Sequence, residues 1–95
     1  MATSRNALIS RLKKKFTIDS EIQPSEKFDG RKNAIWMSGE GNDYIKDSVI
    51  PMFNYYNESD DYESGVHSDV VDFLDDNGWF AEWVDGGTIM IYVEK

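Results

Sequence analysis

The sequence predicts an α+β fold, and three observations support this prediction. Apolar residues recur at helical spacing over residues 4–15 and 65–76, whereas residues 79–84 and 88–93 are rich in the aromatic and β-branched side chains that favour strands. Glycine-containing turns separate these runs. The 95-residue chain, 40% of it hydrophobic, has the size of one domain with a single modest core. We therefore expect one domain over residues 1–95, in which a four-stranded, mainly antiparallel sheet of two hairpins carries three helical segments, mainly on one face.

The N-terminal run is expected to form the first helix and to end near Lys15. Leu8 and Leu12 recur at four-residue spacing, and Thr3 or Ser4 can cap the helix by accepting a backbone N–H. Lysines gather at the end of this helix, where the helix dipole favours cations. We interpret this basic run as a solvated helix end and not as a site for nucleic acid or an anionic membrane.

The next segment is expected to form the first hairpin. Residues 17–28 are interpreted as an extended edge strand, because Pro24 is tolerated at the edge of a sheet. Asp29-Gly30 is a turn signal, and residues 33–38 form a short strand that carries Trp36.

The third helical segment is expected over residues 43–56, where apolar side chains such as Ile45 and Met52 recur at helical spacing. Pro51 removes one backbone donor, so the segment is either one kinked helix or two shorter ones. Residues 57–64 form a polar, acidic connection.

The most regular helix is expected over residues 65–76. Val70 and Leu74 belong to an apolar stripe, while aspartates occupy the other positions. Ser64 can cap its start, and Asn77-Gly78 supplies the left-handed residue that ends it.

A second hairpin is expected to follow, with the positive φ angles of a tight turn supplied by Asp85-Gly86-Gly87. With a two-residue loop, alternation predicts two apolar faces. One face would carry Phe80, Glu82, Val84, Ile89, Ile91 and Val93, and the other Trp79, Ala81, Trp83, Met90 and Tyr92. An antiparallel hairpin with one solvated face would alternate apolar with polar residues, so a second covering layer is implied. We therefore predict an interface at Trp36, Trp79, Trp83, Met90 and Tyr92.

The charge distribution is asymmetric. The net charge is −8, but residues 1–16 carry +5, which leaves −13 for the remainder. Residues 47–94 contain twelve carboxylates and no Lys or Arg. This pattern predicts an acidic surface at Asp60, Asp61, Glu63, Asp69, Asp72, Asp75 and Asp76. Such a field attracts basic partners and repels phosphates, so we expect no direct nucleic-acid binding by this half.

Catalytic motifs are absent from the sequence. The chain has no cysteine and a single histidine, His67, whose neighbours Ser64 and Ser68 do not assemble a catalytic triad with it. The acidic segment does not match the calcium-binding loop, and residues 38–43 lack the lysine of a phosphate-binding loop. We expect no metal, no cofactor and no enzymatic activity. No apolar run reaches a membrane span of roughly 18 residues, so we expect a soluble, cytoplasmic chain without membrane contact.

Three functional hypotheses follow. The first is a protein-interaction module that uses an aromatic sheet face and an acidic surface. The second is a structural homodimer, in which a second copy covers the tryptophan face. The third is an inhibitor or nucleic-acid mimic that binds a basic protein, because the short, acidic, aromatic-rich composition resembles that of small accessory proteins of bacteriophages. An enzyme ranks last.

Overall fold

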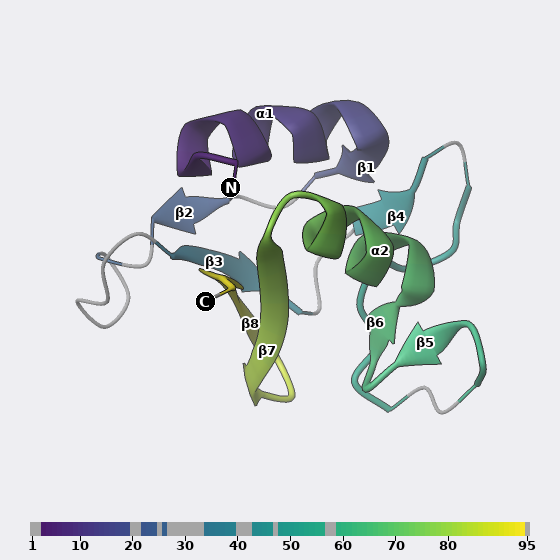
Figure 1. Ribbon diagram of the computed structural model, residues 1–95. Helices are drawn as coiled ribbons and strands as arrows, with labels where there is room; N and C mark the ends of the chain where they lie inside the picture. The colour runs from purple at the N-terminus through teal and green to yellow at the C-terminus, as the bar shows by residue number, and fades with distance from the viewer. Residues whose placement is uncertain are drawn as a thin grey trace.

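The computed structural model describes residues 3–19, 22–24, 26, 34–39, 43–46, 48–56 and 59–94. Two helices and several short antiparallel strands confirm the α+β class (Figure 1). In chain order the elements are α1 (Arg5–Lys15), β1 (Phe16–Ile18), β2 (Gln23–Pro24), β3 (Ile35–Ser38), β4 (Asp43–Ile45), β5 (Tyr62–Glu63), β6 (Val66–His67), α2 (Ser68–Asp76), β7 (Trp79–Asp85) and β8 (Thr88–Val93). The predicted turn at residues 29–30 lies outside the described residues.

The main sheet has four antiparallel strands in the order β2-β3-β8-β7. The strand predicted over residues 17–28 is divided in the structure: Thr17 and Ile18 belong to β1, which pairs with β4, and only Gln23 and Pro24 pair with β3. The expected C-terminal hairpin, β7–β8, is joined to β3 through the pairing of β3 with β8. Two further two-stranded ladders, β1–β4 and β5–β6, lie outside this sheet and were not predicted. Among the described strands β7 pairs with β8 alone, so it forms an edge of the main sheet.

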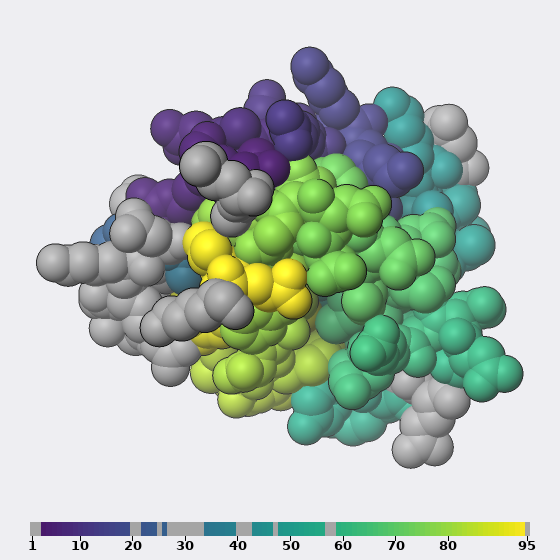
Figure 2. Space-filling model, viewed as in Figure 1, coloured from purple at the N-terminus to yellow at the C-terminus, as the bar shows by residue number. Residues whose placement is uncertain are grey.

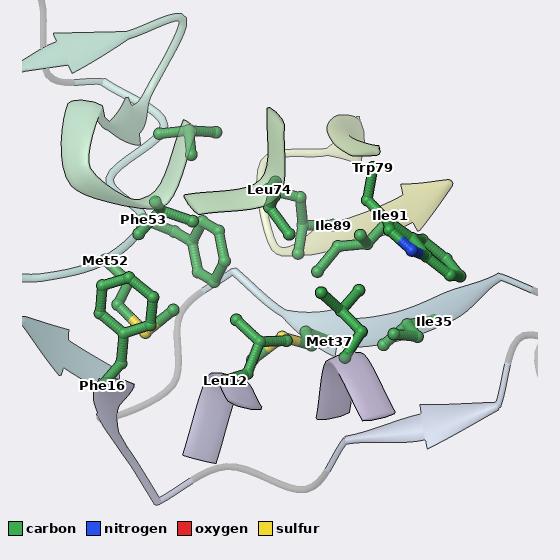
Figure 3. Packing of buried hydrophobic residues seen from close by; sticks show 13 residues of the cluster. Leu12, Phe16, Ile35, Met37, Met52, Phe53, Leu74, Trp79, Ile89 and Ile91 are labelled. Carbon is green, nitrogen blue, oxygen red and sulfur yellow. The ribbon is translucent and has the colours of Figure 1, made fainter. Parts of the chain in front are cut away.

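Both helices cover the same face of the main sheet (Figure 3). From this sheet face, Met37, Ile89 and Ile91 meet Leu12 of α1 and Leu74 of α2, and each of these side chains is almost completely buried. Burying side chains of this kind contributes about 1.5–3 kcal/mol each. The spacing of Leu8 and Leu12, and the helix end at Lys15, agree with the prediction.

The third predicted helix is wrong, because Asp43–Ile45 forms the strand β4 and the chain returns beside it at Pro51 and Met52. Tyr44 bridges to Pro51, and the N–H of Met52 donates to the carbonyl of Asp43 at 3.0 Å. In the turn between them, the Ser48 hydroxyl accepts the N–H of Ile50 and donates to a carbonyl. Helical spacing of apolar residues therefore did not identify the structure here, since proline and a serine turn favour the hairpin.

The helix predicted over residues 65–76 begins three residues later than expected. Its N-cap is His67, whose Nδ1 accepts the N–H of Asp69 at 3.1 Å. Ser64 and Gly65 instead have φ angles of 50° and 80° and form the two-residue turn between β5 and β6. Two successive positive φ angles are the signature of a tight hairpin turn. The helix end is as predicted, with Gly78 at φ 78°.

A buried asparagine fastens α1 to the end of α2. Asn77, 8% exposed, accepts hydrogen bonds at Oδ1 from the Thr3 hydroxyl and from Arg11, at 2.8 and 2.7 Å. Its Nδ2 donates to the carbonyl of Phe73 at 2.8 Å. The indole N–H of Trp79 then donates to the Thr3 carbonyl at 2.7 Å. The start of the chain is thus held against the point where α2 ends and β7 begins.

The predicted faces of the C-terminal hairpin are wrong, because a β-bulge near Val84 shifts the register of β7 against β8. Asp85 pairs with Thr88, but Trp83 pairs with Ile89, so one extra residue is accommodated between them. Neither Gly86 nor Gly87 has the positive φ angle that was predicted. One extra residue in a strand exchanges the faces of every residue beyond it, and a bulge also supplies local twist. The helix-covered face therefore carries Trp79, Ala81, Trp83, Ile89, Ile91 and Val93, and the opposite face carries Phe80, Glu82, Met90 and Tyr92.

Candidate protein-binding groove

The five residues of the predicted interface do not form one surface. Trp79 and Trp83 lie on the helix-covered face, whereas Trp36, Met90 and Tyr92 lie on the opposite face. Trp79 is 2% exposed and Met90 is fully buried, while the other three side chains are half-buried. The bulge is the reason, because it exchanges the faces of β7 relative to β8. An interface role for the five residues stays a prediction, but they do not share a face.

The seven residues of the predicted acidic surface are all exposed, and the fold brings their two segments together. The N–H of Ser68, the first residue of α2, donates to the carbonyl of Asp61 at 2.8 Å. Figure 2 shows α2 in green beside the teal-green segment around β5 on one side of the molecule. None of the seven carboxylates forms a salt bridge with a Lys or Arg of the described residues. Their charge is therefore not neutralised within the described part of the chain.

A groove of about 580 Å³ lies between α2, the β5–β6 hairpin and β7. Its apolar lining comes from all three elements and consists of Val66, Val71, Leu74, Trp79, Phe80, Ala81 and Trp83. Pockets of this size and character are typical of binding sites in proteins. Part of the core face beside β7 is thus left accessible between α2 and the β5–β6 hairpin.

The groove is also lined by four acidic residues, and none of the described residues in its lining is basic. They come from four separate parts of the chain: Glu63 in β5, Asp75 in α2, Glu82 in β7 and Glu94 after β8. Glu63 and Asp75 belong to the predicted acidic surface, whereas Glu82 and Glu94 do not. The result is an apolar groove with a single sign of charge.

Trp83 forms a firmly held wall of this groove. Its indole N–H donates to the carbonyl of Ser64 at 2.7 Å, and its ring packs edge-to-face on Phe53 and Tyr55, at centroid distances of 6.3 and 5.0 Å. Gly39 lies flat against the ring, because a Cβ at this position would overlap it. A fixed aromatic wall lowers the entropic cost of binding a ligand.

His67 is a structural residue in this fold. It is 9% exposed, caps α2 and packs edge-to-face on Tyr62 at 5.1 Å. The Tyr62 hydroxyl donates to the carbonyl of Pro51 at 2.6 Å, and burial, followed by the charge of Asp61, raises the pKa of Tyr62.

Within the described ranges, no three His, Asp or Glu side chains are grouped to hold a metal ion. Neither of the two described helices is long and apolar enough to cross a membrane.

The sequence contained signals for part of this groove. The Ser64-Gly65 dipeptide is a turn signal, and it positions the β5–β6 hairpin that forms one wall. No comparable signal places Glu82 and Glu94 on the same groove, because their proximity depends on the pairing of β7 with β8. Residues 38–43, which lack the lysine of a phosphate-binding loop, are described only in part, because residues 40–42 lie outside the described residues.

Comparison with protein-family models, curated proteins and solved structures gave no match to this chain.

Proposed function

We propose that this chain is a non-catalytic protein-interaction module whose acidic side binds a basic segment of another protein. The observation that carries the proposal is the apolar groove whose described lining contains four acidic residues, Glu63, Asp75, Glu82 and Glu94, and no basic residue. The exposed acids of α2 and of the β5 segment extend the same charge around the groove. Complementary charge raises association rates and selects among partners, while apolar contact in the groove supplies affinity.

The position of two of these acids supports a role in binding. Asp75 and Asp76 occupy the last turn of α2, and no basic residue lies in that turn. Carboxylates near a helix C-terminus are unfavourable because of the helix dipole, by about 0.3–1 kcal/mol each. Residues that violate a local stability rule are expected at functional sites. We infer that these two charges serve binding at some cost in stability.

Peptide selection on the immobilised chain tests this proposal. Random displayed peptides should be enriched in Lys and Arg, and their affinity, measured by fluorescence anisotropy, should fall steeply as salt is raised. The double variant Asp75→Asn/Asp76→Asn should bind these peptides about five- to tenfold more weakly, the effect expected of two partly exposed ion pairs.

A matched control removes the same charge elsewhere. The control is Asp19→Asn/Asp85→Asn, because Asp19 and Asp85 are both exposed and neither lines the groove. The carboxylate of Asp85 accepts the N–H of Gly87, and the amide oxygen of the Asp85→Asn side chain can accept it as well. This variant should bind with nearly unchanged affinity. Selected peptides without an excess of Lys and Arg, or equal effects of the two double variants, would contradict the proposal.

A further inference from the structure

We propose that the groove accepts its partner as an added β-strand, with an extended, Lys- or Arg-containing segment of another protein pairing with the free edge of β7. This inference rests on the proposed function and specifies its partner. Strand addition to an exposed sheet edge is a recurrent mode of peptide recognition, in which main-chain hydrogen bonds supply affinity and side-chain pockets supply specificity.

The first step of the argument is the position of β7. It is an edge strand of the main sheet, and its seven residues are the longest run of strand in the described chain. Five positions, Trp79, Phe80, Ala81, Glu82 and Trp83, line the groove. The remaining lining comes from the β5–β6 segment, from α2 and from Glu94, with none from β3 or β8. The groove therefore follows the outer edge of β7.

The second step is the direction of the backbone groups. The N–H of Glu94 donates to the carbonyl of Gly78 at 2.9 Å, which makes Trp79 and Val93 a pair without mutual hydrogen bonds. Since hydrogen-bonded and non-hydrogen-bonded pairs alternate, Ala81–Ile91 is also a pair of this kind. The N–H and C=O groups of Ala81 therefore point away from β8, along the edge that borders the groove. Among the described residues, Ala81 has no backbone hydrogen bond across this edge.

The third step is the charge of the occupant. An added strand would run beside Glu82, with Glu63, Asp75 and Glu94 around it. Alternate side chains of a strand point to opposite sides, so a segment that alternates apolar and basic residues can meet both the apolar lining and these carboxylates. Opposite charges on neighbouring strands stabilise a strand pair and like charges destabilise it, so a basic segment is favoured over an acidic one beside these carboxylates.

A second copy of this chain is a poor occupant of the groove. Pairing β7 with β7 of another copy would bring the two Glu82 side chains and the other groove carboxylates near one another. Residues 47–94 provide no Lys or Arg to offset them. The proposal therefore commits to a basic segment of a different protein.

Synthetic peptides test strand addition without altering the protein. The probe is a seven-residue peptide of alternating Lys and Val with blocked ends, and binding is measured by fluorescence anisotropy. Methylating its backbone nitrogens on one edge preserves charge and side chains but removes the hydrogen-bond donors. We expect a loss of about tenfold or more, which corresponds to roughly one or two hydrogen bonds. The matched control is a peptide methylated only on its other edge, and its affinity should fall less.

A variant of the protein tests the same contact from the other side. Ala81→Pro removes the outward N–H while leaving the hydrogen bonds between β7 and β8, since proline is tolerated on an edge strand when its missing donor faces solvent. Ala81→Ser keeps the N–H and serves as the control. The Pro variant should lose about tenfold in affinity and the Ser variant little. Circular dichroism establishes that both are folded, and if the Pro variant does not fold, the methylated peptides still decide the question.

The outcomes separate this inference from the proposed function. If both methylated peptides bind as tightly as the parent, strand addition is overturned, while salt-dependent binding of basic peptides would still support an acidic interaction module. If no basic sequence binds at all, both proposals fail. If sedimentation shows a dimer that Ala81→Pro dissociates, a second copy occupies the edge and the basic segment is overturned as its partner.

Discussion

Tyr62 shows how a single hydroxyl group links the β5–β6 hairpin to the segment before it. Its hydroxyl donates to the Pro51 carbonyl at 2.6 Å from a half-buried position. Burial, and then the charge of Asp61, raises the pKa of Tyr62 above its ordinary value of 10.0. Both effects oppose ionisation, so the folded chain resists deprotonation more than the unfolded chain does.

We predict that Tyr62→Phe lowers the free energy of unfolding by about 1 kcal/mol at pH 7, the usual contribution of one such hydrogen bond. A raised folded-state pKa stabilises the fold below the unfolded pKa, and this stabilisation is lost as pH rises from about 10 through the folded pKa. The difference between wild type and variant should therefore shrink above pH 10. Urea unfolding from pH 7 to 11.5 measures it, with Tyr56→Phe, at an 83% exposed position, as control. A pH-independent difference would contradict the prediction.

At the scale of elements, the bulge in β7 decides which side chains reach the core. Without it, a two-residue turn would pair Val84 with Ile89 and would place Trp79 and Trp83 on the face away from the helices. With it, Trp79 packs beneath the helices and Trp83 forms the wall of the groove. Burial of these two indoles outweighs the loss of one regular pair, because each aromatic side chain buries a large apolar area.

Deletion of single residues in β7 tests this explanation. Deleting Val84, which is 48% exposed, removes the extra residue and preserves the pairs Trp83–Ile89 and Trp79–Val93. We expect a folded protein that loses less than about 1.5 kcal/mol. Deleting Glu82 forces either Trp79 or Trp83 out of register, so we expect a loss of about 3–5 kcal/mol or complete unfolding.

Urea unfolding followed by tryptophan fluorescence measures both deletions. The explanation is wrong if the two deletions destabilise equally, or if the protein without Glu82 remains as stable as the wild type.

At the scale of the whole molecule, charge opposes compaction. The net charge is −8, and residues 47–94 contain twelve carboxylates but no Lys or Arg. Self-repulsion of this kind destabilises the folded state and is screened by salt. The end of α2 adds an unfavourable local interaction, since Asp75 and Asp76 lie near its C-terminus.

We predict that Asp75→Asn/Asp76→Asn raises the free energy of unfolding at low salt by about 0.5–2 kcal/mol, because it reduces both the repulsion among the carboxylates and the unfavourable interaction with the helix dipole. The gain should diminish as salt is added. Asp69→Asn removes one negative charge from the first turn of α2, where the dipole favours an anion, and should give no gain. Thermal unfolding at two salt concentrations distinguishes the three proteins. Equal stabilisation per removed charge at the two helix ends would indicate that only net charge matters.

The elements that sequence patterns predicted are those with local signals. Leu8 and Leu12 at four-residue spacing, with Ser4 as cap, identified α1, and Gly78 identified the end of α2. The helix predicted over residues 43–56 was wrong, because the same spacing of apolar residues is compatible with a hairpin whose two arms both reach the core. The acidic surface was predicted from charge alone. The groove was not, because its carboxylates come from four separate segments.

The sequence by itself determined the α+β class, the apolar strands at the C-terminus and the separation of basic from acidic halves. These properties depend on short-range propensity and on composition, which a linear pattern contains. Only the tertiary structure decided the faces of β7. A one-residue bulge leaves the alternation on either side unchanged, so its presence depends on which register buries more apolar area against the helices. The same choice placed Trp83 on the helix-covered face, where it forms a wall of the groove to which we assign partner binding.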